Sequence, residues 1–561
     1  MAEVEGAKGD ARRAVLMLRF WRSFSGVGLM IGTLFFAASL TPSLIPRNFA
    51  TQGVLSGCAL AAGYGLGVFF RWLWRYLELP EPEGRLALRG KQVAMIGCAL
   101  VAALFLWRAA GWQNSIRALM GMTPVDTAHP LEVGAIALLA FAILLLLARL
   151  FRVILQFAAR RARSVAPRRV SNVVGAAIAI AVFWAAIDGV LFRFALRAAD
   201  SSFRAVDALM EPDAPRPSDP NKTGSAGSLV EWADLGRMGR SFVASGPTRE
   251  TLRAFLKRDA MEPLRVYVGL RSGETAEERA KLALEELKRV GGFARSSLVV
   301  IMPTGTGWID PEGIDPLEYL HRGDVASVAI QYSYLASWLS LLTEPGYGDE
   351  AARALFKEIY GYWTTLPKDD RPKLYLYGLS LGALSSEKSS ELFEVIGDPY
   401  QGVLWAGPPF PSRIWRSATD NRNPGSPAWL PRFRDGSYIR FTNQTNALGD
   451  PVAGWGPIRL VYLQYASDPI TFFEIASLYR RPAWMIGPRG PDVSPDLRWY
   501  PVVTFMQLLL DVMMATQSPM GHGHVYAGAH YIDPWIAVTD VRDWSPDEIA
   551  RLKRFFSERA Q

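Results

Sequence analysis

Ser380 lies in a sequence that is typical of a catalytic nucleophile. The pattern GLSLG over residues 378–382 follows an apolar run from Leu374 to Tyr377, and a segment of small residues that can form a helix comes after it. In a nucleophile elbow a strand turns sharply into a helix, which strains the serine and exposes its hydroxyl, and the glycines avoid collisions with the neighbouring backbone. The pattern alone is weak evidence in a chain of 561 residues, but the strand and helix around it favour a serine nucleophile over a chance match in a loop.

A serine nucleophile requires a base, and three histidines follow Ser380: His522, His524 and His530. In folds with this elbow the triad residues occur in the order serine, acid, histidine. We expect His524 to be the base because the surrounding glycines can present it at a sheet edge. His522 remains the alternative, since either could satisfy the geometry. The two histidines could instead share a metal ion, but no cysteine and no clear third ligand lies nearby, so we expect neither a metal site nor a cofactor.

Two aspartates are candidates for the acid that orients the base. Asp468 follows the strand-like run from Leu460 to Tyr465 and precedes Pro469, which is where the triad acid of this fold belongs. Asp450 is the alternative, in the turn-rich stretch 446–451, where an aspartate more often forms a turn. We therefore expect Asp468 to be the acid.

The oxyanion that forms during acyl transfer needs two hydrogen-bond donors. The backbone N–H of Leu381, directly after the nucleophile, is the expected first donor. The second is expected from the loop 304–307, where Thr306 and its neighbour Gly305 follow a buried strand and glycine lets the backbone approach a substrate closely. The alternative is that this loop is simply a tight turn.

A sheet must position these residues. Strands are expected over 265–270, 297–303, 325–332, 374–377 and 460–465, and helices over 276–290 and 350–363. Alternating strands and helices predict an α/β fold with a mostly parallel sheet that is covered on both faces. The catalytic residues would then gather at the carboxyl ends of the strands.

The first part of the chain has a different composition, with most of the surplus of apolar residues before about residue 196. Five apolar segments can be counted: Gly26–Ile45, Val54–Phe70, Val93–Trp107, Val133–Ala148 and Val173–Phe192. A helix needs about 20 residues to cross the hydrocarbon core, so the middle three segments require flanking residues. Successive apolar helices without a polar face would be unfavourable in water. We therefore predict a five-helix transmembrane bundle.

Basic residues between these segments predict the orientation. From the N-terminus, the basic residues that flank the segments are Lys8, Arg12, Arg13, Arg19 and Arg22; then Arg47; then Arg71, Arg75, Arg85, Arg89 and Lys91; then Arg108 and Arg117; then Arg149, Arg152, Arg160, Arg161, Arg163, Arg168 and Arg169. This alternation is the positive-inside pattern with a cytoplasmic N-terminus. Five spans would make this a multi-pass cell-membrane protein whose catalytic domain is extracytoplasmic.

Charge and cysteine content agree with this arrangement. The net charge is +8, but much of the arginine flanks apolar segments and no basic stripe interleaved with aromatics occurs in the second half, so we expect no nucleic-acid partner. The two cysteines, Cys58 and Cys98, both lie in apolar segments, so the extracytoplasmic part is expected to lack disulfides.

The expected domains are a transmembrane helical domain over 1–198, a connector over 199–262 and a catalytic domain over 263–561. Within the connector, residues 211–228 are rich in Pro, Ser and Asp, and their low apolar content predicts a mobile linker.

Four motifs of the second half strengthen this assignment: PTGTGW (303–308), QYSYLASWLS (331–340), LYLYGLSLGA (374–383) and GHGHVY (521–526). Behind a multispan N-terminal region, they resemble a bacterial membrane family, the alpha/beta-hydrolase family with its own N-terminal membrane domain. The resemblance covers nearly the whole chain and implies the α/β-hydrolase fold and a hydrolase activity, but no substrate. The family pattern has glutamate where Leu379 stands, at a position that varies among such elbows.

The combined expectation is a membrane-anchored serine hydrolase that acts outside the cytoplasm on an ester. Its substrate would be a small molecule or a lipid, and the membrane location favours a lipid or acyl-linked ester. An acyltransferase would use the same triad until deacylation, so it remains an alternative. The alternative from another class is a binding or transport component without turnover. Retention of Ser380, Asp468 and a following histidine weighs against that alternative. The sequence does not indicate the oligomeric state.

Overall fold

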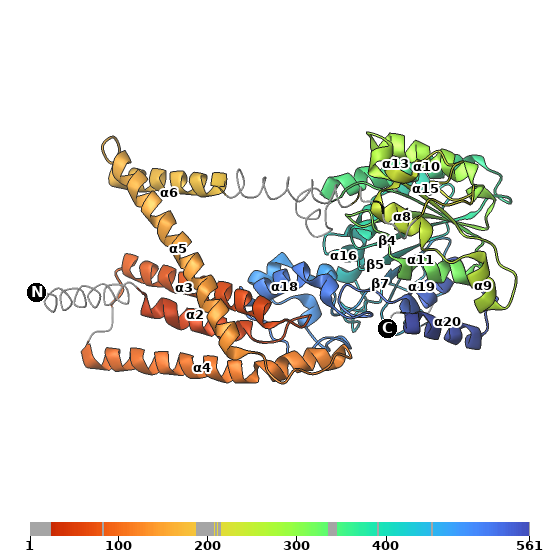
Figure 1. Ribbon diagram of the computed structural model, residues 1–561. Coiled ribbons are helices and arrows are strands. Elements are labelled where there is room, and N and C mark those ends of the chain that lie inside the picture. The colour runs from red at the N-terminus through yellow and green to blue at the C-terminus, as the bar shows by residue number, and fades with distance from the viewer. Residues whose placement is uncertain are drawn as a thin grey trace, which may run out of the picture. The chain divides into compact units, whose positions relative to one another are not determined.

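The structure is a computed structural model, and it describes residues 24–80, 84–186, 207, 210, 215–334, 345–389, 392–449 and 453–559 (Figure 1). The chain forms two compact units. The first comprises residues 1–190 with two segments of the C-terminal half, 474–482 and 493–511. The second comprises residues 191–473, 483–492 and 512–561.

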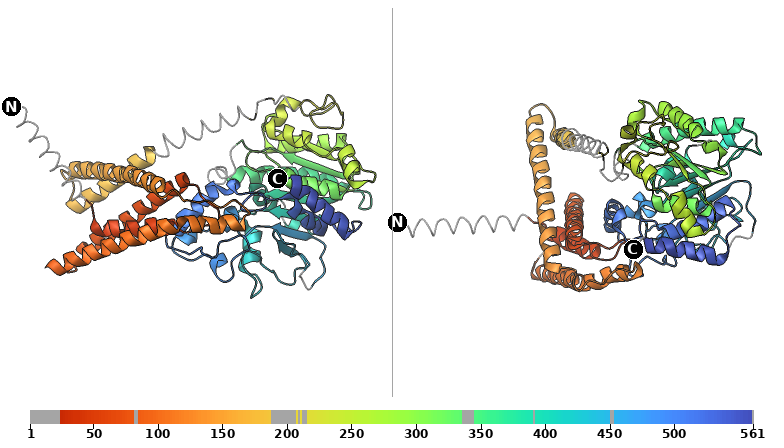
Figure 2. Two further views of the ribbon diagram at one scale, coloured as in Figure 1. Left: turned by 60° about the horizontal axis from the view of Figure 1, so that its bottom comes forward. Right: turned by 45° about the vertical axis from the view of Figure 1, so that its right-hand side comes forward.

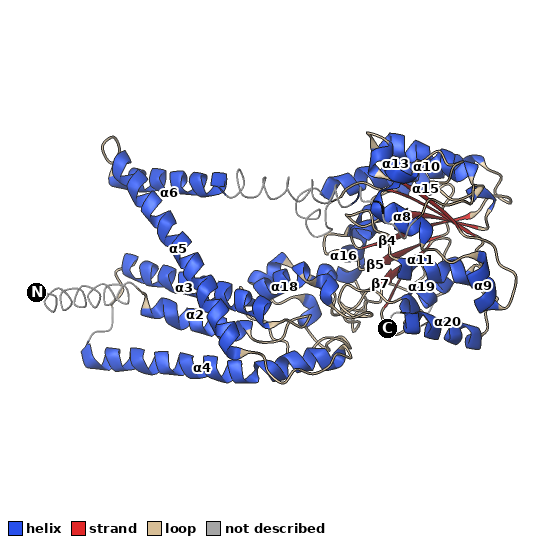
Figure 3. Ribbon diagram, in the orientation of Figure 1, coloured by secondary structure: helices blue, strands red, loops and turns tan. Residues whose placement is uncertain are grey.

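The second unit is built on a seven-stranded sheet (red in Figure 3). Its strands are β1 (Leu264–Val268), β2 (Ser297–Met302), β3 (Val325–Ile330), β4 (Lys373–Leu379), β5 (Gly402–Ala406), β6 (Ile439–Thr442) and β7 (Arg459–Leu463). They lie in the order β1-β3-β2-β4-β5-β7-β6, and every neighbouring pair is parallel. This confirms the predicted α/β fold with a parallel sheet.

Helices cover both faces of the sheet, which explains why β1, β2, β3 and β5 are buried along their whole length. On one face α10 (Ala276–Arg289) lies beside α13 (Pro345–Thr365). On the other face α11 (Pro311–Leu320) and α20 (Pro546–Arg559) contact α19 (Gly528–Thr539) (Figures 1 and 2). The sequence encodes these helix starts: Thr275 and Glu278 form a capping box at α10, and Asp310 caps α11.

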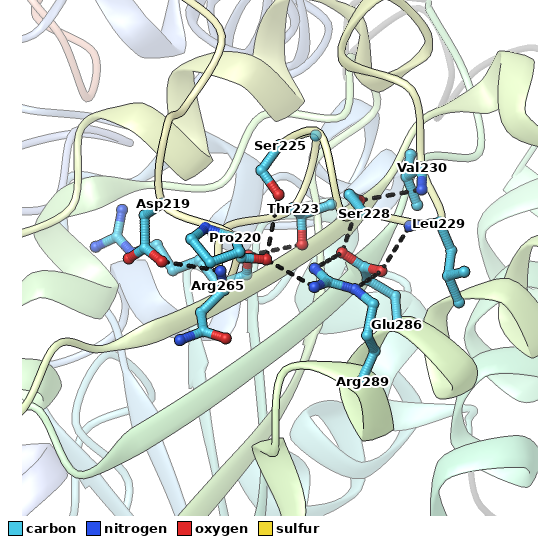
Figure 4. A network of polar contacts seen from close by, with 12 residues as sticks. Asp219, Pro220, Thr223, Ser225, Ser228, Leu229, Val230, Arg265, Glu286 and Arg289 are labelled. Carbon is cyan, nitrogen blue, oxygen red and sulfur yellow. Dashed lines mark hydrogen bonds and ion pairs between the residues drawn. The ribbon is translucent and has the colours of Figure 1, made fainter.

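The predicted connector is in part a packed segment. Figure 4 shows residues 219–230 against β1 and α10: Ser228 Oγ and the N–H of Leu229 donate to the carboxylate of Glu286, at 2.7 and 3.0 Å. Arg289 donates to the same carboxylate and, at 2.6 Å, to the carbonyl of Pro220. The expectation of a mobile linker over 211–228 is therefore wrong for the described residues that make these bonds. Their partners, Glu286 and Arg289, lie on α10, so the linker sequence alone could not reveal the contacts.

Two further helices of the connector also pack. Helices α8 (Gly236–Ala244) and α9 (Arg249–Leu256) precede β1, and α8 contacts it. The domain boundaries at residues 198 and 262 remain a prediction.

In the described part of the N-terminal region, the first unit contains five helices: α2 (Gly26–Ser39), α3 (Phe49–Tyr76), α4 (Gly84–Leu119), α5 (Pro130–Ala162) and α6 (Arg168–Trp184). Small residues bring the backbones of α2 and α3 together. A Cβ added at Gly67 would lie 2.7 Å from Cα of Gly28, and one at Gly63 would lie 2.9 Å from Cα of Gly32. Such close approach through small residues is typical of helices in a membrane.

The expectation of five membrane spans is wrong for the described residues, in which three helices are long and apolar enough to cross a membrane: Phe49–Tyr76, Leu88–Leu119 and Pro130–Ala162. The first apolar segment forms a helix of only 14 residues, because Pro42 follows its end and residues 40–45 continue as a loop. The apolar residues of this loop are buried against other parts of the protein: Leu40, Leu44 and Ile45. The segment predicted over 173–192 runs past α6 and beyond the described residues.

The N-terminal helices suggest a membrane-associated protein. The segments 474–482 and 493–511, which were expected to belong to the catalytic domain, are part of the same compact unit as these helices.

Candidate active site

Ser380 lies at a strained turn between β4 and α14 (Leu381–Glu387). Its φ of 57° and ψ of −126° are unfavourable for a residue with a side chain. The flanking glycines are required by close backbone contacts, since a Cβ at Gly378 would lie 2.4 Å from the carbonyl carbon of Gly382 and one at Gly382 would lie 2.1 Å from the carbonyl oxygen of Met302. The strand-turn-helix context that distinguishes a nucleophile elbow from a chance pattern is therefore present.

Asp468 follows β7 and caps the short helix α17 (Pro469–Phe472). Its side chain is fully buried. Oδ1 accepts a hydrogen bond from the N–H of Ile470 at 2.8 Å, and Oδ2 lies 2.7 Å from Nδ1 of His524 and accepts from the hydroxyl of Tyr526 at 2.8 Å. A carboxylate held in this way fixes the imidazole so that Nδ1 is the donor to Asp468 and Nε2 is left to accept a proton.

The imidazole of His524 lies beside the backbone that also holds the elbow. The N–H of Ser380 donates to the carbonyl of Ala406 at 3.0 Å, and a Cβ added at the next residue, Gly407, would lie 2.7 Å from Cε1 of His524. Nε2 of His524 is buried and has no hydrogen-bond partner among the residues that the structure describes. The free imidazole nitrogen and the serine therefore belong to the same small region at the carboxyl ends of β4 and β5.

The loop that carries His524 is closely fixed. Gly521 and Gly523 adopt positive φ angles of 86° and 57°, which explains the glycine at both positions. The N–H of Gly523 donates to Ser467 Oγ at 2.8 Å, and Ser467 Oγ donates to the carboxylate of Asp492 at 2.6 Å. Gln444 Nε2 donates both to Asp492, at 2.7 Å, and to the carbonyl of Gly521, at 3.2 Å.

The structure separates the two candidate bases. His524 contacts Asp468, whereas Nδ1 of His522 lies 3.8 Å from Asp492 and has no hydrogen-bond partner in the described part of the chain. The third histidine, His530, is 2.6 Å from the hydroxyl of Tyr465, and burial lowers its pKa to about 4. The alternative acid, Asp450, lies outside the described residues.

The expected oxyanion donors lie on two elements that touch. Leu381 is the first residue of α14, so its N–H has no carbonyl of the same helix to bond. Gly305 and Thr306 belong to a turn that begins at Thr304, whose N–H donates to the carbonyl of Trp308 at 2.9 Å. The start of α14 packs on the residues before this turn, since a Cβ at Gly382 would also lie 3.1 Å from the carbonyl oxygen of Pro303.

Sequence reasoning missed three residues of this region: Tyr526, which donates to Asp468, and Ser467 with Asp492, which hold the histidine loop. Tyr526 lies inside the motif GHGHVY, but its partner is 58 residues away in the chain. The described ranges contain no group of three or more His, Cys, Asp or Glu side chains that could hold a metal ion.

Comparisons with known proteins agree with this geometry. Residues 264–552 match the model of the Alpha/beta-hydrolase family, and residues 40–247 match the model of the Alpha/beta-hydrolase family N-terminus. No curated protein and no solved structure matches the chain.

Proposed function

Because this chain belongs to the alpha/beta-hydrolase family, which supports a hydrolase-type function, we propose that it is a membrane-anchored serine hydrolase that cleaves an ester. Its substrate would be a lipid or another acyl-linked small molecule. The lipid part rests on the three apolar helices that could cross a membrane. The observation that carries the proposal is the buried pair of Asp468 and His524, 2.7 Å apart, beside the strained Ser380.

In the proposed reaction Ser380 Oγ attacks the ester carbonyl while Nε2 of His524 takes its proton. Asp468 keeps the imidazole oriented and stabilises the imidazolium. The backbone N–H groups of Leu381 and Thr306, with Gly305 making room, would donate to the oxyanion. His524 then returns the proton to the leaving alcohol, and a water molecule, deprotonated by the same imidazole, releases the acyl group from Ser380.

The location of the activity is part of the proposal. The ends of α3 and α4 that flank the loop between them carry five basic residues, against a single arginine between α2 and α3, which favours a cytoplasmic position for the α3–α4 loop. With three spans the chain would return to the cytoplasmic side at the end of α5. We propose one further crossing after α5, so that the α/β unit would be extracytoplasmic, in the cell membrane of a bacterium.

Labelling with a fluorophosphonate probe tests the chemistry without knowledge of the substrate, because the probe traps only an activated serine. The full chain in detergent should be labelled, and both Ser380→Ala and His524→Ala should lose labelling, whereas His522→Ala should retain it. If the folded native chain is not labelled, the hydrolase proposal is wrong. If His522→Ala loses labelling and His524→Ala does not, the assignment of the base is wrong.

A further inference from the structure

The short helix α18 (Val503–Met513) has its polar and apolar sides reversed relative to a helix of a water-soluble domain. The residues buried along it include the polar Thr504, Gln507 and Asp511. Its other side carries large apolar residues that are half-buried or exposed: Phe505, Met506, Leu509, Leu510 and Met513. Leu509 is 38% exposed and Met513 is 53% exposed.

Gln507 and Asp511 on the polar side of α18 bond the end of α2 and the loop that follows it, whereas the hydroxyl of Thr504 accepts from the N–H of Tyr500 at 2.7 Å. The Asp511 carboxylate accepts from Ser43 Oγ and from the N–H of Leu44, each at 2.9 Å. Gln507 Nε2 donates to the carbonyls of Thr41, at 3.0 Å, and Ser39, at 3.3 Å. All of these residues belong to the compact unit that contains the membrane-spanning candidates.

A second exposed apolar segment, residues 475–481, lies beside the start of the same helix. Ile475, Leu478 and Tyr479 are 65%, 38% and 73% exposed. The carbonyl of Leu478 accepts from the N–H of Val502 at 2.9 Å, directly before α18, so the two segments are joined. Arg480 and Arg481 follow and are exposed.

A helix in water buries its apolar side, because that burial is what stabilises it. In lipid the requirement is the opposite: polar groups must be satisfied within the protein, and apolar side chains can face the hydrocarbon. Helix α18 meets the second requirement and not the first. Its 11 residues would extend only about 16 Å, too short to cross a bilayer. A tyrosine and arginines beside the apolar residues are typical of the membrane interface.

We propose that α18 and residues 475–481 form a second lipid-contacting surface, which enters one leaflet of the membrane without crossing it. The apolar side of α18 would contact acyl chains, and Tyr479 with Arg480 would lie among the headgroups. The occupant of this surface is a phospholipid bilayer, in continuity with the apolar helices of the same unit. The inference does not depend on the catalytic proposal.

Single-cysteine labelling tests this surface without an activity readout. The two native cysteines are free, so Cys58→Ala and Cys98→Ala give a background into which Leu509→Cys, Met513→Cys or Tyr479→Cys is introduced. A matched control is Ile396→Cys, because Ile396 is an equally large apolar residue that is 68% exposed in the α/β unit. Each full-length variant is labelled with the environment-sensitive dye NBD and reconstituted into phosphatidylcholine vesicles.

At Leu509 and Met513 we expect blue-shifted emission that lipids with nitroxide groups on their acyl chains quench by roughly half or more, as for side chains buried several ångströms below the headgroups. Tyr479 should be quenched more by headgroup nitroxides, and Ile396 by neither. Emission at Leu509 and Met513 that matches Ile396 would overturn the proposal. A blue shift without lipid quenching would also overturn it, since it would mean that protein, such as a second copy of the chain, covers this side.

Discussion

Asp468 is held by more donors than a single triad contact provides, and Tyr526 is the least expected of them. Its hydroxyl donates to the same Oδ2 that faces His524, at 2.8 Å. Because Tyr526→Phe removes only this donor, we expect the rate of fluorophosphonate labelling to fall by about tenfold, in line with about 1.5 kcal/mol for a hydrogen bond to a charged group.

The matched control is Tyr360→Phe. Tyr360 lies on α13, and its hydroxyl donates to the carbonyl of Asp398 at 2.8 Å. This variant should label at the native rate. Equal rates for both variants would mean that Tyr526 only fills space beside Asp468.

Ser467 is the next residue whose role can be separated from packing. It joins Asp492 to the N–H of Gly523 and so positions the loop that carries His524. We expect Ser467→Ala to lower the labelling rate by about 30-fold, because two hydrogen bonds of about 1 kcal/mol each are lost where the loop must be precise to within a fraction of an ångström.

Ser327→Ala is a fair comparison, since Ser327 is also fully buried but its hydroxyl has no hydrogen-bond partner in the part of the chain that the structure describes. A labelling rate for Ser467→Ala as high as that for Ser327→Ala would count against a positioning role for Ser467.

The sequence could indicate which residues are candidates for the site, but it could not indicate which side chains they would bond. Ser380 directly follows β4 and Asp468 comes five residues after the end of β7, so both could be proposed from a local signal. His522 and His524 could not be separated, since both lie in one glycine-rich loop and the distinction is made by Asp468, 56 residues away. Asp492 had no signal at all, because its role depends on side chains from other segments.

At the scale of elements, the elbow gives the clearest stability prediction. A Cβ at Gly382 would lie 2.1 Å from a backbone oxygen of β2, which cannot move without distorting the sheet. Gly382→Ala should therefore destabilise the α/β unit by about 1–3 kcal/mol, the usual range for overpacking. Thermal unfolding of the purified protein in detergent measures this as a lower Tm.

The same substitution has the opposite expected sign on α13. Gly361 is exposed within that helix, and an added Cβ would meet no atom within 4 Å. Gly361→Ala should stabilise by about 0.5–1 kcal/mol, because alanine loses less backbone entropy in a helix. A Tm that falls equally in both variants would argue against the close contact at the elbow.

The start of α11 makes a prediction about pH. Burial, and then the nearby Glu312, raise the pKa of Asp310 to about 8, whereas an aspartate in an unfolded chain titrates near 4. The folded protein therefore holds a proton that the unfolded chain releases between about pH 4 and about pH 8. The contribution of Asp310 to stability is complete below this window and is lost as the pH rises through it.

Asp310→Asn removes this titration and retains an oxygen that can accept from the N–H of Glu312, as Asp310 now does at 3.0 Å. The Tm of the variant relative to the native protein should thus increase steadily from about pH 4 to about pH 8. In Asp435→Asn no such trend is expected over this range, because Ser437 lowers the pKa of the exposed Asp435. A constant Tm difference for Asp310→Asn would show that Asp310 is ionised in the fold.

The first apolar segment shows why a membrane span could be predicted wrongly. Leu40, Leu44 and Ile45 extended the first apolar segment, but residues 40–45 form a buried loop. Ser43 and Leu44 of this loop donate hydrogen bonds to Asp511 of α18, more than 400 residues later in the chain. Periodicity and composition report that a residue is hidden from water, and they do not report whether lipid or protein hides it. Strands β1, β2, β3, β4 and β7 were predicted because each is an apolar run that is signalled within a few residues, whereas β5 and β6 were not predicted.

At the scale of the whole molecule, the contacts of α18 constrain the topology. Residues 40–47 lie at one end of α3, and residues 77–83 follow its other end. If α3, α4 and α5 each cross the membrane, the end of α5 is on the side of residues 77–83. The Asp511 carboxylate accepts hydrogen bonds from Ser43 and Leu44, which would lie on the opposite side of the membrane. The chain must then cross once more between Ala162 and residue 215, an interval that contains α6.

This argument predicts where two exposed residues can be labelled in intact cells. By the positive-inside rule, the basic residues around 71–91 predict that residues 77–83 lie in the cytoplasm. The α/β unit, whose residues 492 and 512 flank the segment of α18, would then lie outside. In a background without Cys58 and Cys98, Arg542→Cys, at a side chain that is 81% exposed, should react with an impermeant maleimide in whole cells. Glu78→Cys, at an exposed residue between α3 and α4, should react only after the membrane is permeabilised. If both residues are labelled from the same side, the additional crossing is ruled out. Residues 77–83 and the α/β unit would then lie on one side of the membrane.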